Sequence, residues 1–366
     1  MISSKEKIST SQAVTLLICS TLGVGILSLP RNLVEKVSGA GFIVLIISTL
    51  ICVLLGYFIY KIIYHFPNKT FMEIGETLLT KPVAYLACLI FLIYYLCSMG
   101  IVVRIFAEVV KMYMLKKTPT EVIIISMLFV CGYGAKRGIE GIARMSQVLL
   151  FLIVIPIMFI FLFSFETADF TNLMPIFNTD FSKIIISVGS TIFSFSGFEL
   201  MLILGFFLRN PSKGFKIQYT TLIFIGVLYI FFSVISVAVF GQVETTHLMW
   251  PTLTIVKVID IPGAFLENLD ALVMGAWTLN IFITICMFLY ISALITGDIL
   301  SCKETNYFNY FFIPVVYLIS LCPQNLAHVY DILNSKFMVS IQIMAMVVIP
   351  TIMFVILILK KKVSKI

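Results

Sequence analysis

Long apolar runs recur along this chain from residue 10 to residue 359, with only short polar gaps between them. A helix needs about 20 apolar residues to cross the roughly 30 Å hydrocarbon core of a bilayer. Ten candidate spans of that kind lie near residues 10–36, 40–64, 82–110, 119–135, 145–165, 181–208, 215–240, 267–296, 307–322 and 336–359. The 366 residues are 60% hydrophobic and only 12% charged, which excludes a water-soluble globular protein. We therefore expect an all-α integral membrane protein with ten transmembrane helices in a single domain.

The basic residues indicate how these spans are oriented. There are 25 Lys and Arg against 18 Asp and Glu, and most of the basic ones, including those of the short tail at 360–366, face the cytoplasm if both termini do. Cytoplasmic loops carry an excess of Lys and Arg, so we expect the N- and C-termini inside. Lys111, Lys116 and Lys117 are the main exception. Because the basic residues are spread over short loops, they predict orientation and not nucleic-acid binding.

Two spans contain a glycine-marked interruption near their middle. In the first span Gly23-Val24-Gly25 follows Ser20-Thr21, and in the sixth span Gly197 follows Ser194-Phe195-Ser196. One Gly-x-Gly alone would more often be a close helix contact. Interruptions at corresponding positions of two halves instead predict an inverted five-plus-five repeat with a binding site at the bilayer midplane. The two repeats would cover about residues 10–165 and 181–359.

The residues around the interruptions form the candidate ligand site. The N-terminus of a half-helix suits a carboxylate, whereas the opposite broken end offers carbonyl groups to an amine or a cation. We expect an amino acid to place its carboxylate on the N–H groups of residues 23–25 and its amine on carbonyl groups of residues 194–197. Nearby hydroxyls would assist, and phenylalanines would form an apolar wall. The expected ligand-binding residues are Ser20, Thr21, Gly23, Val24, Gly25, Phe193, Ser194, Ser196 and Gly197.

Three charged residues in or near the spans have two interpretations each. Glu199 follows the second interruption, where a carboxylate costs about 2.5–3.5 kcal/mol unless it is paired, protonated or hydrated. It would either support the unwound segment or contact a ligand amine, or else it would merely cap free N–H groups. Arg104 and Glu108 lie one turn apart near the outer end of the third span. They would either snorkel to the interface or form a charged gate or docking site.

The segment after the seventh span is too polar to cross the membrane. Residues 252–258 within it would form a short helix at the interface. Trp250 directly before it has the amphipathic ring typical of an interfacial anchor, and we expect that role for it.

Several of these motifs resemble known membrane proteins. Gly23-Val24-Gly25-Ile26 and Phe195-Ser196-Gly197-Phe198-Glu199 are similar to the paired signatures of the amino acid-polyamine-organocation (APC) transporter superfamily. Three further elements resemble the B subunits of Ger-type spore germinant receptors, in the spore permease family. They are Leu29-Pro30-Arg31, the run from Arg104 to Glu108 with Lys111 and Thr118-Pro119, and Trp250-Pro251-Thr252. The resemblance covers nearly the whole chain.

The resemblance implies a LeuT-like fold, with discontinuous first and sixth helices, in the inner membrane of an endospore. There the B subunit would bind a small nutrient, commonly an amino acid, and pass a conformational change to an A subunit and a lipoprotein C subunit. It also implies a gating or structural role for Glu199 in preference to direct ligand contact.

Three classes of function remain open: a germinant-sensing subunit, a proton- or cation-coupled amino acid transporter, and a conduit for water or ions. Coupled transport needs a second charge or a cation site near the substrate. Residues 145–165 of the fifth span contain no charge, although some proton-coupled relatives have a lysine there. The hydroxyls of Thr284, Ser292 and Thr296 in the eighth span are spread out. Both observations favour sensing over coupled transport.

The sequence predicts no enzyme, metal site or cofactor. The three histidines, His65, His247 and His328, fall in separate predicted loops, and the eight cysteines are scattered without paired spacing. No glycine-rich phosphate loop of the Walker type is present. We therefore expect no catalytic residues.

Overall fold

The computed structural model describes residues 6–176, 179–258, 269–302 and 304–363, and within these ranges its regular elements are helical. The helices are α1 (Thr10–Thr21), α2 (Gly25–Val37), α3 (Gly41–His65), α4 (Phe71–Leu78), α5 (Lys81–Tyr113), α6 (Thr120–Ala135), α7 (Gly138–Phe163), α8 (Phe181–Thr191), α9 (Met201–Leu204), α10 (Gly214–His247), α11 (Pro251–Val258), α12 (Leu269–Leu300), α13 (Asn306–Leu321), α14 (Leu326–Leu333), α15 (Lys336–Ile343) and α16 (Ile349–Val363).

These helices make the chain an integral membrane protein. In the described part of the chain, six helical stretches are long and apolar enough to cross a membrane, or eight if each of two bent pairs is one span. Each expected span coincides with one helix or with consecutive helices, but α1 and α6 are short, so ten crossings stay a prediction. Residues 267–268 of the eighth expected span and residues 364–366 of the tail lie outside the described residues.

Two short helices, α4 and α14, join the longer ones and were not expected. At the start of α4 the Glu73 N–H donates to Thr70 Oγ1 (3.3 Å), and the Thr70 N–H donates to Glu73 Oε2 (2.8 Å). This capping box satisfies two free donors of the first turn. At the start of α14 the Asn325 side chain accepts from the His328 N–H (2.9 Å). Helices this short follow from caps and packing, so the search for apolar runs of span length missed them.

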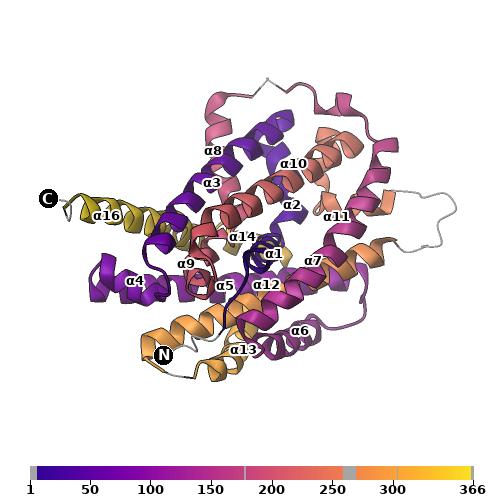
Figure 1. Cartoon of the computed structure of the whole chain (residues 1–366). Helices are drawn as coiled ribbons and strands as arrows, with labels where there is room; N and C mark the ends of the chain where they lie inside the picture. Colours follow the sequence, from indigo (N-terminus) through magenta and orange to yellow (C-terminus); the bar gives the residue numbers. More distant parts are fainter. Residues whose placement is uncertain (1–5, 177–178, 259–268, 303, 364–366) are drawn as a thin grey trace.

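The bundle surrounds its first helix (Figure 1). α1 packs against α7, α10 and α12, and α2 packs against α8, α10 and α11. In the most apolar part of α12, 83% of the residues are buried inside the protein, against 18% for α7. α12 is therefore an interior helix, whereas α7 exposes apolar side chains such as Phe151 and Ile155, as a lipid-facing helix does.

The start of the chain is tied to the end of the second broken helix. The Ile8 N–H donates to the Phe207 carbonyl (2.8 Å), and the Arg209 N–H donates to the Ile8 carbonyl (3.0 Å). Lys7 Nζ donates to the Phe206 carbonyl (2.8 Å), and Glu6 Oε2 accepts from the Ile139 N–H (3.0 Å). These bonds close one end of the bundle around α1.

The contact between α3 and α10 depends on a glycine. A Cβ added to Gly226 would lie 2.5 Å from Thr49 Oγ1 and 3.1 Å from Thr49 Cβ. We expect Gly226→Ala to destabilise the protein by about 1–3 kcal/mol through overpacking. Gly275→Ala is the matched control, because a Cβ there has no heavy atom within 4 Å. Thermal unfolding of both variants in detergent measures the difference, and equal midpoints would contradict this packing.

Candidate functional site

The two interrupted helices break next to each other. α1 ends at Thr21 and α2 begins at Gly25, while the helix that starts as α8 runs to Phe195 and resumes at Phe198 with a bend of 55°. Gly197 between them has φ of +121°, and a Cβ on it would lie 2.7 Å from Thr21 Oγ1. Only glycine tolerates both the conformation and the close approach.

The glycines of the first break have a different role from Gly197. A Cβ at Gly23 would have no heavy atom within 4 Å, and a Cβ at Gly25 would meet Ser194 at 3.9 Å, which is an ordinary contact. Neither glycine is required for packing. Their absent side chains leave the backbone uncovered on the side of an adjacent cavity.

This cavity has a volume of about 610 Å³ and lies where the two breaks meet. Of the expected ligand-binding residues, it is lined by Ser20, Thr21, Gly23, Val24, Gly25, Phe193, Ser194 and Ser196, whereas Gly197 is not part of its wall. α5, α12 and α14 contribute further wall residues, including Ile101, Val102, Thr284, Phe288 and Tyr330. The cavity extends to Glu35 and Lys36, which are exposed at the end of α2. Its size is that of a small-molecule site.

Three backbone N–H groups at the first break lack a hydrogen-bond acceptor in the described structure. In the part of the chain that the structure describes, the N–H groups of Val24, Gly25 and Ile26 have no hydrogen-bond acceptor, and α2 has no side-chain cap. Val24 and Gly25 line the cavity. The N-terminus of α2 therefore offers uncapped donors and a partial positive charge to a cavity ligand.

Tyr229 on α10 joins the two breaks. Its fully buried hydroxyl lies 3.2 Å from the Thr21 carbonyl oxygen and 2.9 Å from the Ser194 carbonyl oxygen. One O–H donor is thus shared between a carbonyl of each broken helix. It satisfies the Ser194 carbonyl, which accepts no other hydrogen bond in the described structure, and it adds a second donor to the Thr21 carbonyl, which also accepts from the Gly23 N–H (2.8 Å).

Glu199 caps the second break. Its Oε2 accepts from the Gly197 N–H (2.8 Å), and its Oε1 accepts from the Tyr94 hydroxyl (3.1 Å). Tyr94 also contacts Ser196 Oγ. Glu199 is fully buried and is not among the residues that line the cavity. The geometry supports the capping interpretation of this carboxyl group.

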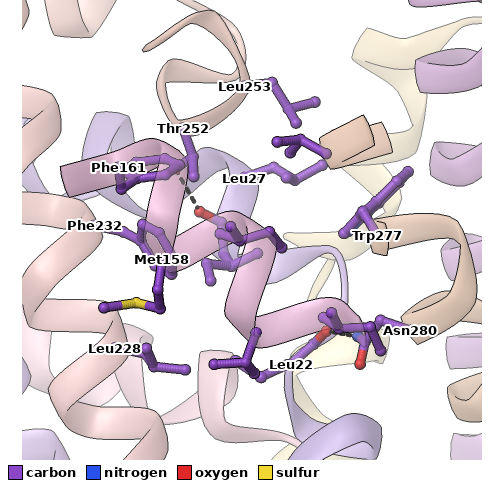
Figure 2. A pocket seen from close by; sticks show the side chains of 15 residues that line it. Leu22, Leu27, Met158, Phe161, Leu228, Phe232, Thr252, Leu253, Trp277 and Asn280 are labelled. Atoms are coloured by element: carbon purple, nitrogen blue, oxygen red, sulfur yellow. Dashed lines mark hydrogen bonds between the residues drawn. The ribbon is translucent and has the colours of Figure 1, made fainter. Parts of the chain in front are cut away.

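α12 supplies donors to the end of α1. Thr284 Oγ1 donates to the Cys19 carbonyl (3.0 Å), and Asn280 Nδ2 donates to the Leu22 carbonyl. Figure 2 shows the Asn280 contact with Leu22 at the edge of a second, smaller cavity. That cavity has a volume of about 50 Å³, and its walls are apolar side chains such as Leu27, Phe161 and Trp277. It lies behind the first break, with Leu22 and Leu27 in its wall.

The charges expected on the third span lie away from the cavity. Arg104 and Glu108 form an ion pair with 2.9 Å between Nη2 and Oε1, and the Arg104 side chain is only 9% exposed. Neither residue lines the cavity, although Ile101 and Val102 of the same helix do. Snorkelling to the interface is therefore wrong for Arg104, because its guanidinium group is buried in the bundle and paired there.

Trp250 is not an exposed anchor either. Its side chain is 1% exposed, and Nε1 donates to the Tyr330 hydroxyl (3.1 Å), which belongs to the cavity wall. The short helix expected after it is present as α11 and packs on α2, where Thr252 Oγ1 donates to the Ile26 carbonyl (3.0 Å). Trp250 thus connects α11 to α14 near the cavity.

Sequence reasoning missed wall residues such as Ile101 and Tyr330. It also missed three residues that hold the breaks: Tyr94, Tyr229 and Asn280. All three are buried polar side chains within apolar helices. Buried polar groups in a membrane interior are costly and are usually hydrogen-bonded, so the amide of Asn280 in particular was a readable signal. Within the described ranges, no three His, Cys, Asp or Glu side chains are grouped as a metal site would require.

The fold places the chain among LeuT-like membrane proteins. It matches MhsT, solved in complex with L-phenylalanine, with a TM-score of 0.70 and 13% identity over 96% of this chain and 88% of that one. It matches Mhp1, a nucleobase-cation-symport-1 family transporter, with a TM-score of 0.71 and 10% identity over 96% and 78% of the two chains. A Na⁺-coupled sialic acid symporter gives a TM-score of 0.65 at 13% identity, covering 94% of this chain and 80% of the symporter. At these identities the likeness shows the fold alone.

Sequence comparison gives the family within that fold. The model of the spore permease family, described as spore germination protein, matches residues 7–329. Spore germination protein YndE of Bacillus subtilis is 27% identical over 89% of this chain and 90% of its own. Spore germination protein GerLB of Bacillus cereus is 27% identical over 83% of this chain and 82% of its own. The chain belongs to the spore permease family of spore germination proteins.

The shared Tyr229 hydroxyl gives a direct test of the joined breaks. We expect Tyr229→Phe to lower the thermal midpoint, because it leaves a buried carbonyl without its donor at a cost of about 1–3 kcal/mol. Tyr219→Phe on the same helix is the control, since its ring is 49% exposed and makes no side-chain hydrogen bond in the described structure. Thermal unfolding compares the two. An unchanged midpoint in Tyr229→Phe would show that the breaks are held together by other contacts.

Proposed function

We propose that the chain is the nutrient-sensing B subunit of a spore germination receptor in the spore inner membrane. It binds a small molecule, an amino acid, between the broken helices and passes a conformational change to an A subunit and a lipoprotein C subunit. The observation that carries this proposal is the cavity of about 610 Å³ with the unpaired N–H groups of Val24 and Gly25 in its wall. Membership of the spore permease family supplies the biological setting.

The geometry supports one orientation of an amino acid. Its carboxylate would accept from the N–H groups of Val24 and Gly25 at the positive end of α2. Its amine would donate to the Ser20 carbonyl, which accepts no hydrogen bond in the described part of the chain. This differs from the expected position of the amine on carbonyl groups of residues 194–197, where the Ser194 carbonyl already accepts from Tyr229. Ile101, Val102 and Phe193 would contact the ligand side chain.

The same geometry supports a route for the signal. With both termini in the cytoplasm, the cavity reaches the outer face at Glu35 and Lys36, and the bonds of Ile8 with Phe207 and Arg209 close the inner end. A ligand shifts a conformational equilibrium only if its affinity differs between the two states. A nutrient held by α2, α5 and α12 at once would favour the arrangement in which these helices enclose it. Partner subunits would respond to that change.

A coupled amino acid transporter is the second candidate, because the fold is that of transporters such as Mhp1 and the sialic acid symporter. Purified protein in liposomes distinguishes the two. A sensor is expected to bind an amino acid without accumulating it, whereas concentrative uptake of radiolabelled amino acid by this chain alone would establish transport.

Adding a methyl group to the cavity wall tests the binding site separately from folding. Gly23→Ala meets no atom within 4 Å, so we expect a folded protein whose cavity is narrower beside the free N–H groups. In a thermal-shift screen of the twenty amino acids, the amino acid that shifts the wild-type midpoint should give no shift with Gly23→Ala, or should bind this variant with an apparent affinity at least tenfold lower. Spores that carry Gly23→Ala or Gly25→Ala should germinate poorly in that nutrient at unchanged protein abundance.

Gly189→Ala in α8 is the matched control for this experiment. Its added Cβ also has no heavy atom within 4 Å, but Gly189 does not line the cavity. It should bind and respond as wild type does. Normal germination of the Gly23→Ala and Gly25→Ala spores would reject the cavity as the nutrient site.

A further inference from the structure

The end of α1 has the chemistry of a cation site. A helix leaves its last carbonyl groups without intrahelical donors, and in membrane proteins with broken helices such carbonyl groups coordinate coupling Na⁺ ions or protons. Here the exposed carbonyl groups would be those of residues 18–22. The Ile18 carbonyl accepts from the Leu22 N–H (2.9 Å), and the Thr21 carbonyl accepts from Gly23 and Tyr229. The groups left for a cation are those of Cys19, Ser20 and Leu22.

Side chains of α12 reach two of these three carbonyl oxygens. Thr284 Oγ1 lies 3.0 Å from the Cys19 oxygen and Asn280 Nδ2 contacts the Leu22 oxygen, as Figure 2 shows for Asn280. Asn280 and Thr284 are one helical turn apart, so a single face of α12 presents both donors. Asn280 brings a positive hydrogen to an oxygen that a cation would otherwise bind. The single hydrogen of the Thr284 hydroxyl is shared between the Cys19 oxygen and the Asn280 carbonyl oxygen of its own helix (3.1 Å).

The amide of Asn280 is held in this orientation. The side chain is 2% exposed, and its Oδ1 has no hydrogen-bond partner in the described structure. Turning the amide over would place Oδ1 against the Leu22 oxygen and bring two acceptors together. Nδ2 therefore stays on the Leu22 carbonyl, at the cost of a buried acceptor without a partner. A cost of that kind indicates that the donor has a function at this position.

In the part of the chain that the structure describes, no acidic side chain is free to neutralise a cation at this end of α1. The carboxylate at the breaks is Glu199, and both of its oxygens are engaged, by the Gly197 N–H and by the Tyr94 hydroxyl. The residues that contact the Cys19 and Leu22 carbonyl groups from α12 are neutral. Asn280 thus places an N–H donor where a hard cation would need a further oxygen ligand or a negative charge.

We propose that Asn280 and Thr284 are positioning residues that act as a built-in substitute for a coupling cation, so that the broken α1 is held, and the ligand is bound, without sodium. The statement that the ligand is bound without sodium rests on the proposed nutrient binding. The statement that the broken α1 is held without sodium concerns the protein without ligand. In a coupled transporter the cation binds and leaves, so its concentration gradient biases the conformational equilibrium. The side-chain donors of Asn280 and Thr284 stay in the protein, so no ion gradient can act through them.

We expect Asn280→Asp to create a cation site at the end of α1. The carboxylate would join the Cys19 and Leu22 carbonyl oxygens and the Thr284 hydroxyl in a set made only of oxygens, which is the set that hard cations prefer. Purified protein without nutrient is unfolded thermally in N-methylglucamine chloride and in NaCl at equal ionic strength and alkaline pH. We expect the wild-type midpoint to be the same in both salts. The Asn280→Asp midpoint should fall by several degrees without sodium and rise saturably as sodium is added.

Two variants control for the loss of an amide. Asn309→Asp changes another buried amide, on α13, whose side chain is 1% exposed and makes no hydrogen bond in the described structure. It should lose stability equally in both salts. Asn280→Ala removes the donor without adding charge and should also be insensitive to sodium. A sodium response in all three variants, or an Asn280→Asp midpoint that does not respond to sodium, would overturn the proposal.

Wild-type protein provides the test that does not depend on any variant folding. Equilibrium binding of radioactive ²²Na⁺ to purified wild type should show no saturable component. Saturable binding near one ion per chain would overturn the proposal. Because both sodium experiments are done without nutrient, their outcome is independent of whether an amino acid binds. Repeating the amino acid thermal-shift screen in the two salts then tests whether the ligand binds without sodium. A thermal shift that appears only in NaCl would contradict this.

Discussion

The backbone polar groups of two helices that stop inside a membrane determine the rest of this structure. Lipid offers these groups no partner, so each must be satisfied by protein, water or ligand. At the second break Glu199 accepts from Gly197, and between the breaks Tyr229 shares its hydroxyl with one carbonyl from each side. At the first break Asn280 and Thr284 donate to the end of α1. The N–H groups of Val24 and Gly25 remain without an acceptor in the described structure, and both residues line the large cavity.

This pattern relates the proposed function of the protein to its fold. The LeuT-like fold supplies two adjacent broken helices, and the family is that of spore germination proteins. The function proposed above uses the donors that stay free at α2, whereas two carbonyl groups at the end of α1, those of Cys19 and Leu22, accept from the chain's own side chains. A fold that elsewhere moves a substrate would in this way serve to detect one, because one end of the site is open to a ligand and the other is fixed.

The sequence was sufficient for the fold and for the position of the breaks. The length of the apolar runs located the helices, and the family and structural matches confirmed the LeuT-like fold and the spore permease family. Gly23, Gly25 and Gly197 marked where the helices stop, although only Gly197 has a conformation and a close contact that require glycine. The structure places eight of the nine expected ligand-binding residues on one cavity wall.

The sequence could not show which side chains from other helices meet the breaks. Tyr94, Tyr229 and Asn280 reach them from α5, α10 and α12, and such contacts depend on the rotation of each helix, which an almost uniformly apolar span does not encode. For the same reason Arg104 was expected at the interface and is buried in an ion pair with Glu108. Short helices such as α14 depend on caps and packing and not on apolar length.

The central claim is that a nutrient binds the free N–H groups at the start of α2. Hydrogen–deuterium exchange, followed by mass spectrometry on overlapping peptides across residues 18–30, reports on those groups directly. With a saturating amount of the amino acid that gives the largest thermal shift, exchange should slow at residues 24–26 and stay unchanged in α16. Unchanged exchange at residues 24–26, in the presence of the same thermal shift, would show that the amino acid binds elsewhere and would contradict the account.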